Sequence, residues 1–122
     1  MARIIVIDDD NAVRAIARRS LEPLGHEVVE AGDGATGISL LAAGGADLVI
    51  TDIFMPGEDG INVARRMRKE FPAVKLIAMS GGGFEGRIDL RSDIKLLGAT
   101  QTLGKPFTPS DLVKVVREVL EA

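Results

Sequence analysis

The sequence contains no cysteine, no tryptophan and no tyrosine, and it has a single histidine, His26. Without cysteine, disulfide frameworks and thiolate metal sites are excluded, and one histidine rarely forms a metal site. We expect His26, between Gly25 and Glu27, to lie in a solvated turn. Any metal ligands are therefore expected to be oxygen atoms.

Long hydrophobic runs are also missing from the sequence. The aliphatic run after Met1 breaks at Asp8, which is too early for the hydrophobic region of a signal peptide. No other segment approaches the length needed to cross a membrane. We therefore expect a cytoplasmic protein without a membrane partner.

Positive charge is not in excess, because 15 Lys and Arg residues stand against 18 Asp and Glu, for a formal net charge of -3. A nucleic-acid-binding domain is usually basic, so we expect no direct nucleic-acid partner. One basic cluster interleaves with apolar residues at helical spacing, which predicts the exposed face of one helix. Its members are Arg65, Arg66, Arg68 and Lys69.

What the sequence does contain is enough apolar material for one aliphatic core: 122 residues, 46% of them hydrophobic. We predict a single domain over residues 1–122. Short β-branched runs alternate with longer segments of helical period, which is typical of an α/β fold whose parallel sheet is covered by helices on both faces. The predicted strands are Ile4–Ile7, Glu27–Ala31, Leu48–Thr51, Lys75–Met79 and Ala99–Leu103.

Four helices are predicted from apolar periodicity, capping residues and chain breakers. They begin near Asp10 or Asn11, at Gly34, at Ile61 and after the cap Thr108, and the first three end near Pro23, Ala43 and Phe71. The glycine-rich segment Ser80 to Arg87 is predicted to be a mobile loop. A further helix after the fourth strand is therefore hard to place.

Polar side chains stand where the predicted strands end. Because the carboxyl ends of parallel strands meet at one edge of the sheet, these side chains are expected to converge there. The first strand is followed by Asp8 and Asp9, the third by Asp52, the fourth by Ser80 and the fifth by Lys105. The set therefore combines three carboxylates, a hydroxyl and an ammonium group.

This set of groups is suited to phosphoryl chemistry. Two carboxylates roughly 5 Å apart repel by about 3 kcal/mol at an effective dielectric of about 20, which a bound cation would offset. Carboxylates without His or Cys suit Mg²⁺, and a carboxylate beside the metal can attack phosphorus. Taken singly, each group has an ordinary explanation: Asp8 to Asp10 as a solvated helix start, Asp52 as a turn residue, Lys105 as a solvated strand end. Their joint position favours one site.

Four segments at these positions resemble one protein family over Arg3 to Leu120. They are VIDDD, DLVITDIFMPGEDG, IAMS and KPF, and together they are similar to the receiver domain of bacterial two-component response regulators. The resemblance implies a flavodoxin-like (βα)5 fold with a doubly wound, five-stranded parallel sheet in the order 2-1-3-4-5. It also implies a phosphorelay signalling domain and not a metabolic enzyme.

The resemblance assigns roles to individual residues. It implies that Asp52 accepts a phosphoryl group from a histidine kinase or a histidine phosphotransfer protein. Mg²⁺ or Mn²⁺ would be bound by Asp52, by Asp9 directly, by Asp8 partly through water, and by the main-chain carbonyl of Phe54. Lys105 would pair with the phosphoryl group, which the hydroxyl of Ser80 would move to bind.

Further expectations concern switching and partners. The Lys105–Pro106 peptide bond is commonly cis in this family. The output would be contact with an unidentified downstream protein, with a homodimer possible through the fourth helix, the fifth strand and the fifth helix. The family usually carries an aromatic switch residue where this chain has Thr102. We therefore hypothesise that phosphorylation orders the glycine-rich loop after Ser80.

Phe54 and Gly82 occupy the positions that flank the path of the attacking water in this family. Because an apolar ring offers nothing to orient that water, we predict slow hydrolysis of the phosphoryl-aspartate.

Three other classes of protein share some of these features. An aspartate-nucleophile phosphohydrolase of the haloacid dehalogenase type would use the aspartates of VIDDDNAV, but it leaves Asp52 without a role. A flavodoxin-type carrier needs a phosphate-binding loop after the first strand, where this chain has aspartates that would repel phosphate. The third class is a receiver that has lost phosphorylation. The complete set of carboxylates, hydroxyl and lysine argues against this class.

Overall fold

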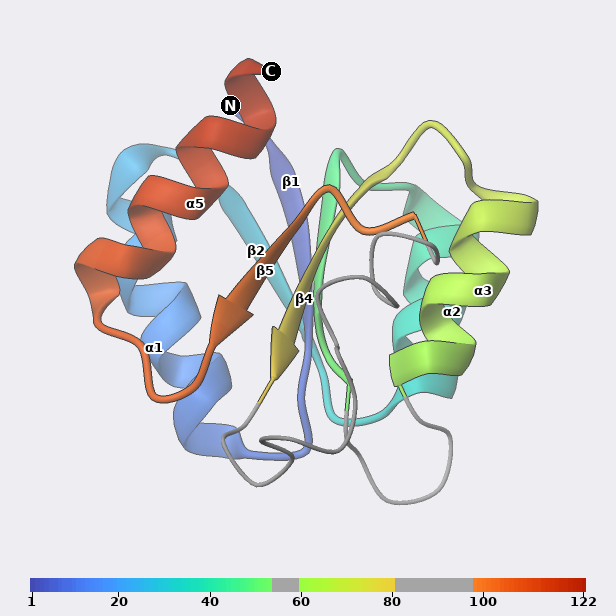
Figure 1. Cartoon of the computed structure of the whole chain (residues 1–122), viewed down its shortest axis with the longest axis horizontal. Coiled ribbons are helices and arrows are strands. Elements are labelled where there is room, and N and C mark those ends of the chain that lie inside the picture. Colours follow the sequence, from blue (N-terminus) through green and yellow to red (C-terminus); the bar gives the residue numbers. More distant parts are fainter. Residues whose placement is uncertain (54–59, 81–97) are drawn as a thin grey trace.

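The computed structural model describes residues 1–53, 60–80 and 98–122 and contains a parallel sheet between two helical layers (Figure 1). The strand order is β2-β1-β3-β4-β5, which confirms the predicted α/β fold and topology. The strands are β1 Arg3–Ile7, β2 Glu27–Ala31, β3 Leu48–Asp52, β4 Lys75–Ser80 and β5 Gln101–Gly104. The helices are α1 Asn11–Leu21, η1 Glu22–Leu24, α2 Gly34–Gly44, α3 Gly60–Glu70 and α5 Pro109–Glu121.

Side chains of the central strands alternate between two hydrophobic cores. Ile5 and Ile7 of β1 pack with residues of α2 and α3, whereas Ile4 and Val6 pack with residues of α1 and α5. Because both faces are covered, β1 is apolar from Ile4 to Ile7, and all five residues of β3 are buried, including Thr51 and Asp52. The central strands, which carry Asp8 and Asp52 at their carboxyl ends, are therefore packed on both faces.

Local capping explains where two of the helices begin. The side chain of Asp10 accepts a hydrogen bond from the Ala12 amide at 2.8 Å, so Asp10 is the N-cap of α1. Thr108 and Asp111 form the predicted capping box at the start of α5, with Pro109 at the first helical position. The predicted strand and helix boundaries agree with the structure to within one or two residues.

Two sequence predictions are corrected by the structure. The fifth strand begins at Gln101 and not at Ala99, because its ladder with β4 starts where Ile77 faces Gln101. Ala99 is nevertheless buried in the core. His26 is not fully solvated: it is half-buried, and its Nδ1 atom accepts a hydrogen bond from the Ala2 amide at 3.2 Å. Burial lowers the pKa of His26.

Several predicted features lie outside the described residues. These are the main-chain carbonyl of Phe54, Gly82, most of the glycine-rich loop and the helix expected between β4 and β5. Within the described ranges, no helix combines the length and the apolar character needed to cross a bilayer. Both chain ends lie at the amino edge of the sheet, opposite the end to which the strands point (Figure 1), and Met1 and Leu120 line the same hollow there.

The start of α3 is pressed against the end of β3. Gly60, the first residue of α3, is buried and donates its amide hydrogen to the Ile53 carbonyl at 3.1 Å. A Cβ atom added to Gly60 would lie 1.9 Å from the carbonyl oxygen of Asp52 and 2.6 Å from the Cα of Ile53. Only glycine allows α3 to begin this close to the carboxyl end of β3.

Candidate functional site at the carboxyl edge of the sheet

Three side chains from distant parts of the chain meet at the carboxyl edge of the sheet. Asp8 follows β1, Asp52 ends β3 and Lys105 follows β5. The Nζ atom of Lys105 lies 2.6 Å from Oδ2 of Asp8 and 3.1 Å from Oδ2 of Asp52. One ammonium group therefore bridges the two carboxylates.

The bridged groups are largely removed from water. The side chain of Asp8 is 0% exposed, that of Asp52 is 8% exposed, and Lys105 retains 21%. Burial raises the pKa of Asp8 above its ordinary value, although hydrogen bonds from Lys105 and from the Asp10 amide oppose the rise. Burial lowers the pKa of Lys105, but its hydrogen bonds to Asp8 and Asp52 and the negative charges of these two groups together outweigh burial and leave the pKa raised. Lys105 is therefore a cation at neutral pH.

The same edge can hold a divalent cation. Asp8, Asp9 and Asp52 each bring a carboxylate oxygen into a group whose members lie within 4.8 Å of one another. All three are hard oxygen donors, the type that Mg²⁺ and Mn²⁺ prefer. Asp9 is exposed, so the cluster opens to solvent on its side. The residues present therefore fit an ion that keeps part of its water shell.

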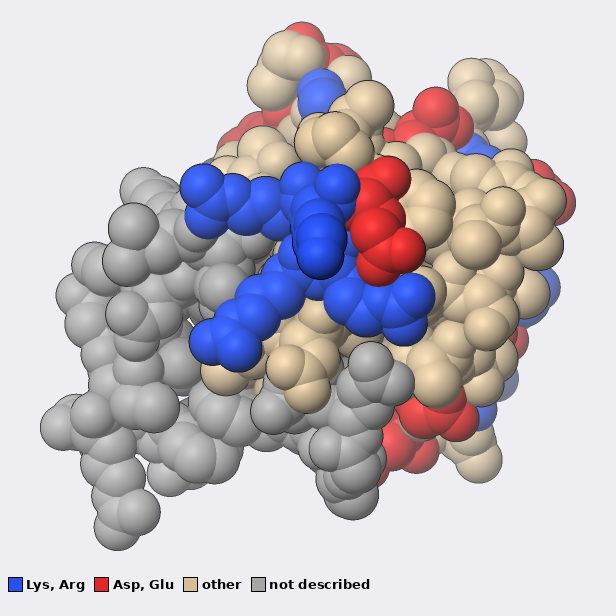
Figure 2. Space-filling view, turned by 90° about the vertical axis from the view of Figure 1, so that its right-hand side faces the viewer, with Lys and Arg blue, Asp and Glu red and all other residues tan. Residues whose placement is uncertain are grey.

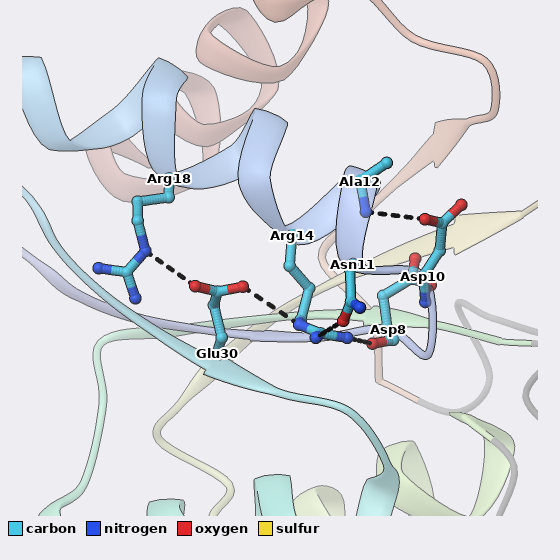
Figure 3. Close-up of polar contacts among 7 residues, drawn as sticks. All are labelled: Asp8, Asp10, Asn11, Ala12, Arg14, Arg18 and Glu30. Atoms are coloured by element: carbon cyan, nitrogen blue, oxygen red, sulfur yellow. Dashed lines mark hydrogen bonds and ion pairs between the residues drawn. The ribbon is translucent and has the colours of Figure 1, made fainter.

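Arg14 of α1 supports the turn that carries Asp8 and Asp9 (Figure 3). Its guanidinium donates hydrogen bonds to the main-chain carbonyl of Asp8 and to the side chain of Asn11. It also pairs with Glu30 of β2 at 3.2 Å, and Glu30 pairs in turn with Arg18 at 2.9 Å. The β1–α1 turn is thus tied to the neighbouring strand and helix.

Replacing Arg14 with methionine is expected to lower the free energy of unfolding by about 1–2 kcal/mol, because three hydrogen bonds from a side chain only 15% exposed are lost. Urea denaturation monitored by circular dichroism measures this. The matched control is Arg18→Met, whose side chain is 40% exposed and which should cost less than about 1 kcal/mol. Equal losses in the two variants would contradict a special role for Arg14.

The fourth and fifth strands bring the remaining polar residues to this edge. Ser80 ends β4 opposite Gly104, and the Ser80 carbonyl accepts a hydrogen bond from the Lys105 amide at 2.7 Å. Thr102 is half-buried in β5 and faces Ala78. The peptide bond between Lys105 and Pro106 is cis.

Comparison with known proteins identifies the family. The family model described as response regulator receiver domain matches residues 4–117 of this chain. The chain belongs to the response regulator receiver family.

Relatives of this receiver domain differ in length. It is 37% identical over 123 residues to the DNA-binding transcriptional regulator NtrC of Azospirillum brasilense, covering 99% of this chain but 24% of that protein. The receiver domain of NtrX from Brucella abortus superposes with a TM-score of 0.89 at 27% identity, covering 98% of each chain. Chemotaxis protein CheY4 of Vibrio cholerae superposes with a TM-score of 0.87 at 28% identity, covering 98% of this chain and 99% of that one. The chain spans about a quarter of its curated NtrC relative.

The receiver structure brings together four of the residues singled out in the sequence: Asp8, Asp9, Asp52 and Lys105. Ser80 lies at the same edge, one strand away from β3. Sequence reasoning missed Arg14. Its position could have indicated the contact, because a residue four positions after the N-cap Asp10 lies on the same face of the helix, where a long side chain can reach the preceding turn.

Replacing Lys105 with methionine in this receiver is expected to lower the free energy of unfolding by about 2 kcal/mol, because two buried carboxylates lose their common cation. The cost is moderated because the Asp10 amide still donates to Asp8 at 2.9 Å. Urea denaturation in EDTA measures the loss. Lys114→Met, on the exposed surface of α5, is the matched control and should change stability by less than about 0.5 kcal/mol. A Lys105 variant as stable as this control would show that the bridge contributes little.

Proposed function

We propose that this receiver domain accepts a phosphoryl group on Asp52 from a phosphohistidine of a histidine kinase or a histidine phosphotransfer protein. The observation that carries the proposal is the bridge from Lys105 to Asp8 and Asp52, with Asp9 beside it. The carboxylates and the ammonium group gathered there are of the kinds that a phosphoacceptor with a bound divalent cation would need as nucleophile, fixed cation and metal ligands. The family match supports this assignment over the hydrolase and flavodoxin alternatives.

In the proposed reaction, an oxygen of the Asp52 carboxylate attacks the phosphorus atom as the bond between phosphorus and the donor imidazole nitrogen breaks. The imidazole leaves with the bonding electron pair, and the product is an acyl phosphate on Asp52. Lys105, which pairs with Asp8 and Asp52 in the structure, would pair with a phosphoryl oxygen after transfer. The hydroxyl of Ser80 would donate to another.

Mg²⁺ or Mn²⁺ would be held by Asp8, Asp9, Asp52 and the main-chain carbonyl of Phe54, and would supply positive charge against the phosphoryl oxygens. Asp8, buried and bonded to Lys105, would act partly through water, whereas the exposed Asp9 would bind directly.

The output of the domain would be a change in protein contacts. We propose a single cytoplasmic domain over residues 1–122 that acts as a switch and has at most weak self-catalysis. A homodimer through the fourth helix, β5 and α5 is one such contact, beside an unidentified downstream protein. Thr102 of β5 stands where an aromatic switch residue is usual, so ordering of the loop after Ser80 would couple the site to its partner.

Intact-protein mass spectrometry tests this proposal. After incubation with acetyl phosphate and Mg²⁺, the protein should gain the mass of one phosphoryl group, and the gain should disappear when EDTA replaces Mg²⁺. A mass readout suits a chain that has neither Trp nor Tyr. No adduct, under conditions in which another receiver domain is labelled, would instead indicate a receiver that has lost phosphorylation.

A further inference from the structure

The exposed face of α3 carries a dense group of cations, visible in Figure 2 as a blue cluster over that helix. We call it the α3 basic face. The chain as a whole has a formal net charge of -3, so positive charge is concentrated here against the overall balance. Its exposed cations are Arg65, Arg66, Arg68 and Lys69.

These cations weaken the helix that carries them. Arg65 lies three and four positions before Arg68 and Lys69, and like charges at this spacing destabilise a helix by about 0.2–0.5 kcal/mol per pair. The helix dipole offsets the cost for residues in the last turn, but Arg65 lies before it. Glu70 pairs with Arg66 at 2.9 Å. Within the described part of the chain, no acidic side chain forms a salt bridge with Arg65 or Lys69, although the charge of Lys69 helps to lower the pKa of Glu70.

Two arginines of α1 are arranged differently. Arg14 and Arg18 share Glu30, and Arg18 also pairs with Glu22 at 3.0 Å. Among the described residues, Arg14 and Arg18 are thus paired with acids of the same chain, whereas Arg65 and Lys69 of α3 are not. These two exposed cations can meet carboxylates from outside the chain.

An apolar hollow of about 120 Å³ adjoins the basic face, and Arg68 forms part of its wall. Met67, Phe71 and Leu76 are among the other residues that line it. Its volume is below the roughly 300–1,000 Å³ of small-molecule sites, so it suits one aliphatic side chain better than a metabolite. Charge and an apolar anchor point therefore lie next to each other on one surface.

We propose that the α3 basic face binds an acidic segment of a partner protein, which places one aliphatic side chain in the hollow beside Arg68. Carboxylates of that segment would pair with Arg65 and Lys69. A protein is favoured over nucleic acid because the hollow offers an apolar anchor and because the rest of this acidic chain repels a long polyanion. The surface lies on the face of the sheet opposite α1 and α5 (Figure 1).

Fluorescence polarisation with a fluorescein-labelled peptide, EDELEDE, tests the proposal. The wild-type protein should bind the peptide, and affinity should fall as salt rises. The double variant Arg65→Glu with Lys69→Glu should bind about tenfold more weakly, since two attractive contacts become repulsive. The control is Lys114→Glu with Arg117→Glu on α5, which changes net charge equally and should bind within about twofold of wild type.

A second double variant distinguishes lost contacts from misfolding as the cause of weaker binding. Arg65→Gln with Lys69→Gln removes the repulsion within α3 and should fold at least as well, while binding the peptide about threefold more weakly. Replacing the central leucine of the peptide with serine should weaken binding about fivefold, because the apolar anchor is lost.

Other results would overturn the proposal. Equal weakening by the α3 and α5 double variants would show general electrostatics and no site. Equal binding of the leucine and serine peptides would exclude the hollow as an anchor. Tighter binding of a labelled oligothymidylate than of the peptide would identify a nucleic-acid surface instead. Acetyl phosphate labelling should be unchanged in all these variants, which separates this surface from the phosphoacceptor proposal.

Discussion

The Asp52→Asn variant is expected to gain no phosphoryl group from acetyl phosphate, whatever the Mg²⁺ concentration. An amide oxygen lacks the negative charge that makes the Asp52 carboxylate a nucleophile toward phosphorus. The fold should survive, because the amide oxygen can still accept the hydrogen bond that Lys105 now donates at 3.1 Å. Losing one of two neighbouring buried charges should leave the free energy of unfolding within about 1 kcal/mol of wild type.

Intact-protein mass spectrometry and urea denaturation, made on the same samples, check the two parts of this prediction. Glu121→Gln is the matched control, since it makes the same chemical change at an exposed position of α5 and should be labelled like wild type. If the Asp52→Asn protein were folded and labelled to the wild-type extent, the phosphoryl group would have to reside on another residue. Asp52 would then be only a metal ligand or a structural carboxylate.

The Gly60→Ala substitution is expected to cause the largest loss of stability, about 3 kcal/mol or more, because the new methyl group collides with main-chain atoms. The nearest of them, the Asp52 carbonyl oxygen, would lie 1.9 Å away. A side chain could rotate out of such a contact, but a buried strand cannot. Either α3 must shift away from β3, or the end of β3 that presents Asp52 must move.

Thermal and urea denaturation measure the stability of the Gly60 variant, and acetyl phosphate labelling measures its effect on the site. The control is Gly44→Ala at the end of α2, where the added atom would meet the guanidinium end of Arg3 at 2.9 Å. That side chain can move, so Gly44→Ala should be neutral or slightly stabilising through helix propensity. A Gly60 variant as stable as the Gly44 variant would show that α3 can be displaced at little cost.

The sequence predicted most of the fold because each strand and helix carries its own local signal. Thr108, Pro109 and Asp111 specify the start of α5 by side-chain chemistry alone, and the structure shows the same capping box. The start of β5 was harder to predict from the sequence. It depends on which residue of β4 faces Gln101 across the sheet, and sequence periodicity does not contain that information.

The candidate site was predictable in its members but not in its contacts. Strand ends indicated that Asp8, Asp52 and Lys105 would converge. That Lys105 bridges both carboxylates depends on side-chain geometry across 97 and 53 residues of sequence separation, which no local pattern encodes. The environment of His26 was likewise hidden, because the hydrogen bond that its Nδ1 atom accepts comes from the amide of Ala2, 24 residues away in sequence.

The position of the two chain ends has a consequence for modular assembly. Residues 1 and 122 both lie at the amino edge of the sheet, while the acidic cluster lies at the opposite edge (Figure 1). A sequence joined to either end would begin at the edge opposite the acidic cluster. It would therefore not block the approach of a bulky phosphodonor to that cluster. The same geometry makes the domain suited to insertion into a loop of another protein, since both of its ends lie at one edge and Met1 and Leu120 line the same hollow. This suitability for insertion depends on the positions of the chain ends and not on the function of the other protein.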